Sequence, residues 1–87
     1  MRLDYAPSFK RQLRKLSYMQ QKKVDEAIKL FSENPFYPSL CTHKLKGKKK
    51  LYYAFKAGYD LRVLFEEKNG FTIIIMVDVG THDHVYY

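Results

Sequence analysis

The hydrophobic residues change their spacing once along the chain, and this change limits what the chain can fold into. Before residue 35 they recur at helical spacing, as in Phe9, Leu13 and Leu16. From Leu51 onward they alternate with other residues in the two-residue period of a β-strand. Residues 71–79 are apolar on both faces, and such a strand is normally central or covered on both sides. The sequence therefore predicts helices packed on a sheet.

Breaking and capping residues divide the first half into elements. Residues 2–5 alternate polar and apolar and predict a short strand, and Pro7 fits the first turn of a helix that follows it. Ser17 and Gln20 have the spacing of a capping box, so a second helix should begin there. It should run to about residue 33, because the residue before Pro35 is pushed out of helical geometry. The short link makes the two helices an antiparallel hairpin.

Turn signals divide the second half into strands. Residues 51–57 and 61–66 alternate and should be joined by a turn at residues 58–60. Asn69-Gly70 suits a type I′ hairpin loop before the last strand. Residues 35–50 hold prolines and a glycine and predict an irregular segment.

A chain of 87 residues has room for a single domain, residues 1–87. The predicted order is β-α-α-β-β-β. We expect an α+β fold in which a helical hairpin packs on a mainly antiparallel, four-stranded sheet.

The charge is strongly positive and uneven. The formal net charge is +7, with 13 Lys/Arg and 4 Asp/Glu in residues 1–50 but 3 and 5 in residues 51–87. A small basic domain usually binds a polyanion or an acidic protein, although basic helix faces can also be merely solvated.

The single cysteine, Cys41, excludes an intramolecular disulfide and a multi-cysteine zinc site, and only His43 nearby could support it as a nucleophile. Met1 is followed by Arg2 and Asp4 rather than by an apolar run, so we expect no signal peptide. No apolar stretch approaches the ~20 residues of a membrane span. These features predict a soluble protein of the reducing cytoplasm, without membrane contact.

The tail from Gly80 to Tyr87 is where proton-transfer chemistry is most plausible. If a helical turn follows Gly80, His82 and Tyr86 share a face, which places an acid/base group beside an aromatic plane. Cleavage of RNA by its own 2′-hydroxyl needs proton transfer and a stacked base. The alternatives are an ordinary surface histidine or a metal site with His84. A metal would be poorly held, because neighbours on a strand point in opposite directions.

Two further groups could bind phosphate. The segment after His43 is rich in lysines, which attract phosphates unless the loop is simply solvated. Its lysines are Lys44, Lys46, Lys48, Lys49 and Lys50. Arg62 can hold a phosphate with two hydrogen bonds, or can instead form a salt bridge with Asp60 or Glu66.

These residues and their order resemble the RelE/ParE superfamily of toxins, over nearly the whole chain. The resembling motifs are Asn34-Pro35, His43-Lys44-Leu45-Lys46-Gly47, Asp60-Leu61-Arg62-Val63-Leu64-Phe65 and Gly80-Thr81-His82 followed by Tyr86. The tail is the most specific of them and is similar to the YafQ-type endoribonuclease branch.

The resemblance implies roles for particular residues. His82 matches the chief acid/base residue, with His43 and Asp60 as helpers and Tyr86 as the neighbouring aromatic. Arg62 matches the arginine that holds phosphate. Lys56 stands where a YafQ-like enzyme tends to have another histidine, and we expect it to help His82 and to bind substrate. Leu61 stands where such an enzyme tends to have Trp.

We therefore expect a toxin of a type II toxin–antitoxin system that cleaves messenger RNA on the ribosome, with no metal or cofactor. It should be a monomer when free and a hetero-oligomer with an acidic antitoxin. A ParE-like inhibitor of DNA gyrase is the alternative with the same fold. A non-catalytic domain that binds RNA or protein is a third possibility.

Overall fold

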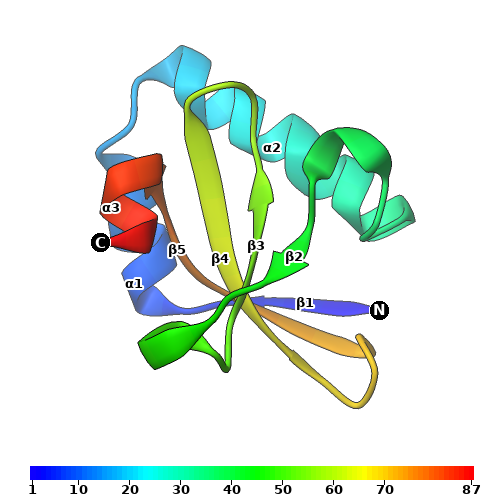
Figure 1. Ribbon diagram of the computed structural model, residues 1–87. Coiled ribbons are helices and arrows are strands. Elements are labelled where there is room, and N and C mark those ends of the chain that lie inside the picture. The colour runs from blue at the N-terminus through cyan, green and yellow to red at the C-terminus, as the bar shows by residue number, and fades with distance from the viewer.

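The structure, a computed structural model that describes all residues 1–87, contains one five-stranded sheet. Its strand order is β1-β5-β4-β3-β2, so the last strand lies between the first strand and β4. β1 pairs in parallel with β5, and the other neighbouring strands are antiparallel. The elements are β1 (Arg2–Tyr5), α1 (Pro7–Arg14), α2 (Tyr18–Glu33), the 3₁₀ turn η1 (Pro38–Leu40), β2 (His43–Lys44), the 3₁₀ turn η2 (Gly47–Lys49), β3 (Tyr53–Lys56), β4 (Leu61–Lys68), β5 (Ile73–Thr81) and α3 (His82–Tyr86) (Figure 1).

The main core lies between the sheet and the first two helices, and Figure 1 shows α2 passing behind β3 and β4. The core cluster consists of Phe9, Val24, Ala27, Phe31, Leu40, Phe55, Ala57, Leu61, Val63, Phe65, Ile74, Met76 and Val79. Phe31 of α2 stacks on Phe55 with ring centroids 4.6 Å apart and meets Phe65 edge-on at 4.9 Å. These contacts attach α2 to the sheet. The predicted α+β architecture is confirmed.

The helix boundaries follow the predicted capping signals. Pro7 opens α1, and Ser17 caps α2 with both bonds of the capping box. The Gln20 backbone N–H donates to Ser17 Oγ at 3.1 Å, and the Ser17 N–H donates to Gln20 Oε1 at 3.0 Å. Asn34 is extended, with φ −155°, and ends α2 just before Pro35. None of the helices has the length and apolar character needed to cross a membrane.

The sheet has five strands and not the four that were predicted. The extra strand is β2, which lies in the segment 35–50 that the sequence pattern marked as irregular. It has only two residues, with His43 opposite Ala54 and Lys44 opposite Tyr53. Two residues cannot display an alternating period, so the sequence pattern carries no signal for this strand.

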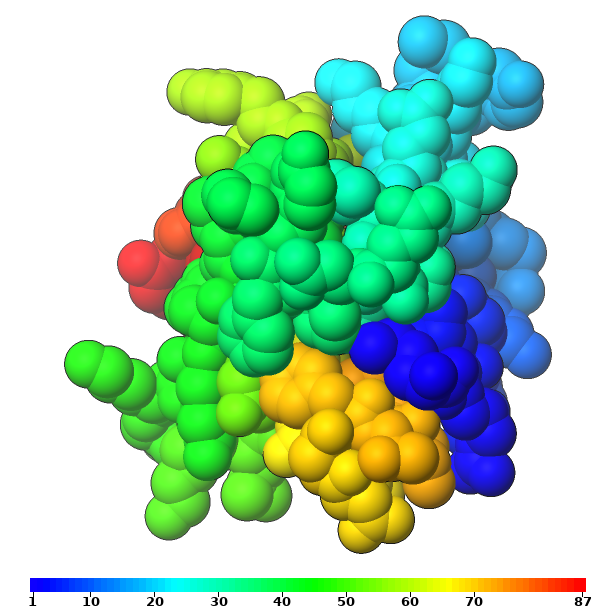
Figure 2. All heavy atoms as spheres, turned by 90° about the vertical axis from the view of Figure 1, so that its right-hand side faces the viewer, coloured from blue at the N-terminus to red at the C-terminus, as the bar shows by residue number.

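The hairpin between β4 and β5 is confirmed, but its loop is longer than a two-residue type I′ turn. Lys68 pairs with Ile73, and the connection includes three consecutive residues with positive φ: Asn69 (56°), Gly70 (62°) and Phe71 (68°). β5 therefore begins at Ile73 and not at Phe71. In Figure 2 the N-terminal residues, in dark blue, lie against this part of the chain, in orange, as the pairing of Arg2 with Ile73 requires.

A β-bulge in β5 determines which side chains of the last strand reach the core. Leu64 pairs with Asp78 but Phe65 pairs with Met76, so Val77 is the extra residue. Met76 is fully buried before the bulge and Val79 is 1% exposed after it. Because side chains alternate along a strand, Asp78 lies on the face opposite Val79 and outside the main core.

We expect replacement of Phe31 with Ala to destabilise the fold by about 3–5 kcal/mol, because the change empties a fully buried aromatic site. Urea unfolding followed by circular dichroism measures the loss. Tyr18→Ala, at a position 77% exposed on the same helix, is the control and should change stability by less than about 0.5 kcal/mol. Equal effects of the two substitutions would contradict this description of the core.

Candidate functional site

The junction between β5 and α3 brings His82 and Tyr86 side by side. Thr81 caps α3, and its hydroxyl accepts a hydrogen bond from the His84 backbone N–H at 3.3 Å. The helical turn places the rings of His82 and Tyr86 with centroids 4.5 Å apart and nearly edge to face, at 66°. The predicted shared face of these two residues is therefore confirmed.

The short strand β2 brings His43 to the same place from a distant part of the sequence. Its ring centroid lies 6.1 Å from that of Tyr86, so both histidines neighbour one tyrosine. A shallow groove of about 380 Å³ contains all three side chains. Its lining residues are His43, Lys44, Leu45, Lys46, His82, Tyr86 and Tyr87.

The hydrogen bond of His43 determines which ring nitrogen is free. Its Nδ1 lies 2.9 Å from the backbone oxygen of Cys41. A carbonyl oxygen can only accept, so Nδ1 carries the proton and donates it to this bond. In the neutral ring, Nε2 then has a free lone pair and can accept a proton. Nδ1 of His82 lies 3.5 Å from Asp83 Oδ1, at the outer limit of a hydrogen bond.

A second groove, of about 530 Å³, contains His82, Asp60 and Arg62. Its other lining residues are Lys56, Tyr59, Thr81 and Asp83. Sheet pairing builds it, because Arg62 lies opposite Lys56 on one side and Gly80 on the other.

The guanidinium of Arg62 does not form the salt bridge that was the alternative to phosphate binding. Its Nη1 donates to the backbone oxygens of Tyr59 at 3.1 Å and Leu61 at 2.9 Å. The ion pair of the protein lies elsewhere and joins Arg2 to Asp4. The other carboxylate contacts join His82 to Asp83 and His84 to Asp78. The positive charge of Arg62 is thus not neutralised by a carboxylate.

The lysine-rich segment lies against the C-terminal helix. A groove of about 390 Å³ is lined by Leu45, Lys46, Lys48, Lys49, Tyr86 and Tyr87. Lys49 Nζ donates to the backbone oxygen of Val85, and a cation is favourable at the C-terminal end of a helix. Lys50 is exposed and lines none of the grooves around α3, so this predicted phosphate-binding residue is not brought to the site.

The environment of Tyr86 keeps its phenol protonated. Burial raises the pKa of the Tyr86 hydroxyl above its usual value, and the nearby Arg62 guanidinium opposes part of that rise. Tyr86 is therefore a neutral hydroxyl near pH 7.

The sequence pattern did not indicate the pair Asp78–His84 or the packing that requires Gly80. His84 Nε2 lies 3.0 Å from Asp78 Oδ1, and the His84 ring lies over Gly80. The spacing of Gly80 and His84 is the signal that could have indicated this packing, because a glycine four residues before a histidine leaves room for its ring at the start of a helical turn. No group of three or more His, Cys, Asp or Glu side chains is arranged to hold a metal ion.

Replacing Arg62 with Met should raise the pKa of the Tyr86 phenol further, because it removes the cation that opposes the effect of burial. The titration can be followed by NMR of ¹³Cζ-labelled tyrosine, with the Tyr86 signal assigned from Tyr86→Phe. Lys68→Met removes a cation from the far end of β4 and should leave this pKa unchanged. A fall in the Tyr86 pKa in Arg62→Met would contradict the geometry.

Comparison with known proteins gives matches at the level of structure. No family model and no curated protein sequence matches the chain. YafQ from E. coli strain BL21(DE3) superposes with a TM-score of 0.81 at 15% identity, over 100% of both chains. The YoeB/ParE toxin from Agrobacterium tumefaciens gives 0.76 at 15% identity, over 94% of this chain and 99% of that one. A chain of the toxin–antitoxin complex RelBE2 from Mycobacterium tuberculosis gives 0.64 at 13% identity, over 93% and 96%.

At these identities the similarity establishes the fold. It agrees with the resemblance noted in the sequence, from the opening strand to the histidine-containing tail. The chain therefore has the fold of the RelE/ParE superfamily of toxins, with YafQ among its near structural neighbours.

Proposed function

We propose that the protein is the toxin of a type II toxin–antitoxin system and cleaves messenger RNA on the ribosome. The observation that carries the proposal is the convergence of His82, His43 and Arg62 around Tyr86, from three separate parts of the chain. Two imidazoles and a guanidinium without a carboxylate partner, beside an aromatic ring, can supply the proton transfers and the charge stabilisation that RNA cleavage requires.

The proposed reaction forms a bond from the 2′-oxygen to the adjacent phosphorus and breaks the bond to the 5′-oxygen. One group removes the 2′-hydroxyl proton and another protonates the departing oxygen, giving a 2′,3′-cyclic phosphate and a 5′-hydroxyl. His82 is the main acid/base residue. His43 is the complementary one, because its Nε2 is free to accept a proton. No metal or cofactor takes part in this scheme.

The negative charge that develops on the phosphate needs a fixed cation. Arg62 supplies it, since no carboxylate neutralises its guanidinium and two backbone carbonyls hold its side chain. Asp60 and Lys56 share the groove of His82 and assist proton transfer and charge balance there. Tyr86 offers a neutral hydroxyl and a ring against which a base can stack.

Binding to the ribosome would use the positive charge. The α1 and α2 lysines and arginines are exposed and suited to ribosomal RNA in the cytoplasm. They are Lys10, Arg11, Arg14, Lys15, Lys22, Lys23 and Lys29. Lys44, Lys46, Lys48 and Lys49 would attract the phosphates of the message beside α3.

The proposed partner is an acidic antitoxin. The solved complex RelBE2 is described as a toxin–antitoxin complex, and α1 of this chain presents a basic face. That face borders a groove of about 440 Å³ between α1 and α2. The groove is lined by Tyr5, Phe9, Lys10, Leu13, Asp25, Ile28 and Lys29. Apolar side chains rimmed by lysines suit an acidic amphipathic helix. A helix bound there would cover part of α1 and leave less of its basic surface free to bind RNA.

His82→Ala should reduce mRNA cleavage by at least about 100-fold, because general acid–base catalysis typically contributes that much. The measurement is primer extension on a reporter mRNA, with translating ribosomes present or absent. Lys68→Met, far from the site, should cleave like the parent.

Each outcome of that experiment has a distinct meaning. Codon-spaced cuts that require ribosomes and depend on His82 support the proposal. Intact mRNA with accumulating DNA double-strand breaks would replace it with the ParE-like inhibition of gyrase. Binding to ribosomes without cleavage would indicate a non-catalytic RNA-binding domain. Full cleavage by His82→Ala would refute the acid/base assignment.

Reversing the four charges of helix α1 should abolish salt-sensitive co-purification with the cognate antitoxin. The variant carries Lys10→Glu, Arg11→Glu, Arg14→Glu and Lys15→Glu, and attraction between exposed charges weakens with salt. Its matched control carries Lys44→Glu, Lys46→Glu, Lys48→Glu and Lys50→Glu, the same change in net charge on another surface. The control should lose cleavage and keep the antitoxin. Equal loss of antitoxin from both variants would mean that only net charge matters.

A further inference from the structure

We propose that His84 and Asp78 are positioning residues for His82 and Tyr86. Their contact, which the absence of a side chain at Gly80 permits, fixes α3 on β5 in the orientation that presents His82 and Tyr86 to the grooves. The effect on catalysis rests on the proposed function. The positioning of α3 by these two residues does not depend on it.

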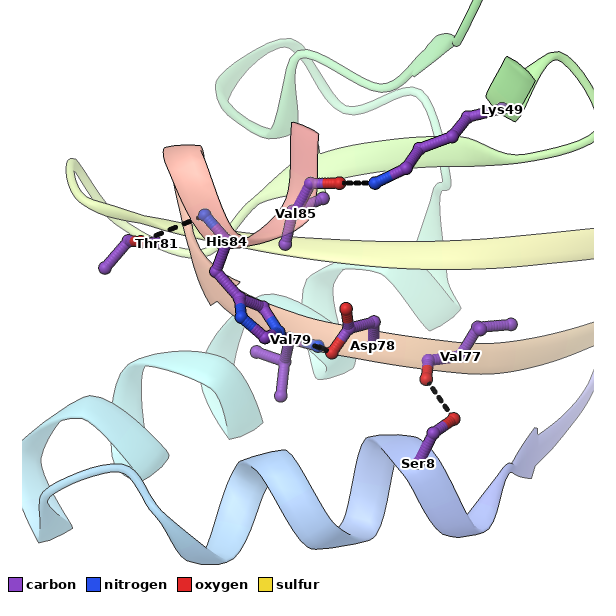
Figure 3. Close-up of polar contacts among 8 residues, drawn as sticks. All are labelled: Ser8, Lys49, Val77, Asp78, Val79, Thr81, His84 and Val85. Carbon is purple, nitrogen blue, oxygen red and sulfur yellow. Dashed lines mark hydrogen bonds and ion pairs between the residues drawn. The ribbon is translucent and has the colours of Figure 1, made fainter. Parts of the chain in front are cut away.

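The contact between His84 and Asp78 links α3 to β5, the strand that precedes it. His84 Nε2 and Asp78 Oδ1 are 3.0 Å apart (Figure 3). The Asp78 carboxylate also accepts the Val79 backbone N–H at 2.9 Å, so its own orientation is fixed. The two side chains are 40% and 24% exposed, and a pair that is partly withdrawn from water orients its residues better than a fully exposed one.

The second support is the space at Gly80. A Cβ there would lie 2.6 Å from Cδ2 and 2.8 Å from Cγ of His84, far inside van der Waals contact. The ring therefore packs directly on the backbone of β5, and any side chain at this position would displace it. Gly80 is needed for this close approach and not for an unusual φ angle, since its φ is not among the positive ones.

The third support is the placement of residues around α3. In a helix, residues four apart share a face, whereas a residue two positions away lies nearly opposite. His82 and Tyr86 therefore point to one side of α3 and His84 to the other. Val85 is fully buried between these two sides. His84 does not share a groove with His82 and would act on it only through the backbone of the helix.

The bulge at Val77 completes the arrangement. It turns Asp78 away from the main core and toward α3, while Val79 enters the core. Ser8 of α1 donates to the Val77 backbone oxygen at 2.6 Å, so α1 contacts β5 at the bulge itself (Figure 3). The β-bulge at Val77 therefore also determines where the Asp78 carboxylate lies, and with it the contact to His84.

The test combines an NMR measurement with cleavage kinetics on the full chain. NMR reports the nuclear Overhauser effect between the rings of His82 and Tyr86, which are 4.5 Å apart. We expect His84→Ala to lose this effect and to slow cleavage roughly 10- to 100-fold at saturating ribosomes, with unchanged affinity for ribosomes, because a small misplacement of a reacting group is that costly. His84→Gln keeps a nitrogen donor near the position of Nε2 and should keep both the nuclear Overhauser effect and the cleavage rate. Asp78→Asn keeps an oxygen acceptor and should keep both as well.

A double-substitution cycle tests the close packing on Gly80. Gly80→Ala alone should displace the His84 ring and weaken the contact between His82 and Tyr86. In the pair Gly80→Ala with His84→Ala the clash with the ring is gone and only the contact with Cβ of residue 84, at 3.1 Å, remains. The loss should therefore be close to that in His84→Ala alone. Additive losses would overturn the proposed packing.

The control is Asp4→Ala, which removes an exposed ion pair with Arg2 at 3.2 Å on β1 and should change neither readout. The proposal is overturned if His84→Ala keeps the ring contact and the cleavage rate, or if His84→Gln is as impaired as His84→Ala. If the parent protein cuts no RNA, the proposed function fails, and the NMR comparison still decides whether His84 positions α3.

Discussion

The ladder between β4 and β5 is the interaction on which the rest of the structure depends. It runs from Leu61 opposite Thr81 to Lys68 opposite Ile73 and is the longest pairing in the sheet. β5 is also the only partner of the edge strand β1, and it leads directly into α3 at its C-terminal end. Because Arg62 lies opposite Gly80, the backbone pairing alone places this phosphate-binding candidate beside the start of the histidine-containing helix.

The two faces of the sheet carry different side chains: one is the apolar core, and the other carries the polar residues of the candidate site. The face under α1 and α2 is filled by aliphatic and aromatic side chains, which leaves no room for a polar site. The opposite face is covered only in part, by α3 and the lysine-rich segment, and it carries Lys56 and Arg62. Polar side chains there can remain hydrated, so they need no buried hydrogen-bond partners and do not interrupt the core.

The sequence predicted the parts of this arrangement that have a period or a capping signal. The helix boundaries at Ser17 and Asn34, the strands and the shared face of His82 and Tyr86 follow from local rules and are confirmed. β2 has too few residues for a pattern, and the bulge at Val77 depends on how β5 meets β4. The resemblance gave His43 a role as a helper, but its contact with Tyr86 depends on the pairing of β2 and could not be predicted from spacing. The periodicity of a segment does not determine its register with a distant strand, so contacts that depend on that register cannot be predicted from it.

α3 has five residues, far fewer than a helix needs to be stable by itself in water. Its conformation must therefore come from tertiary contacts: the cap from Thr81, the burial of Val85, the bond from Lys49 and the packing of His84 on Gly80. Those contacts come from the lysine-rich segment on one side and from β5 on the other. The position of His82 is thus a property of the folded domain as a whole and not of the α3 sequence alone.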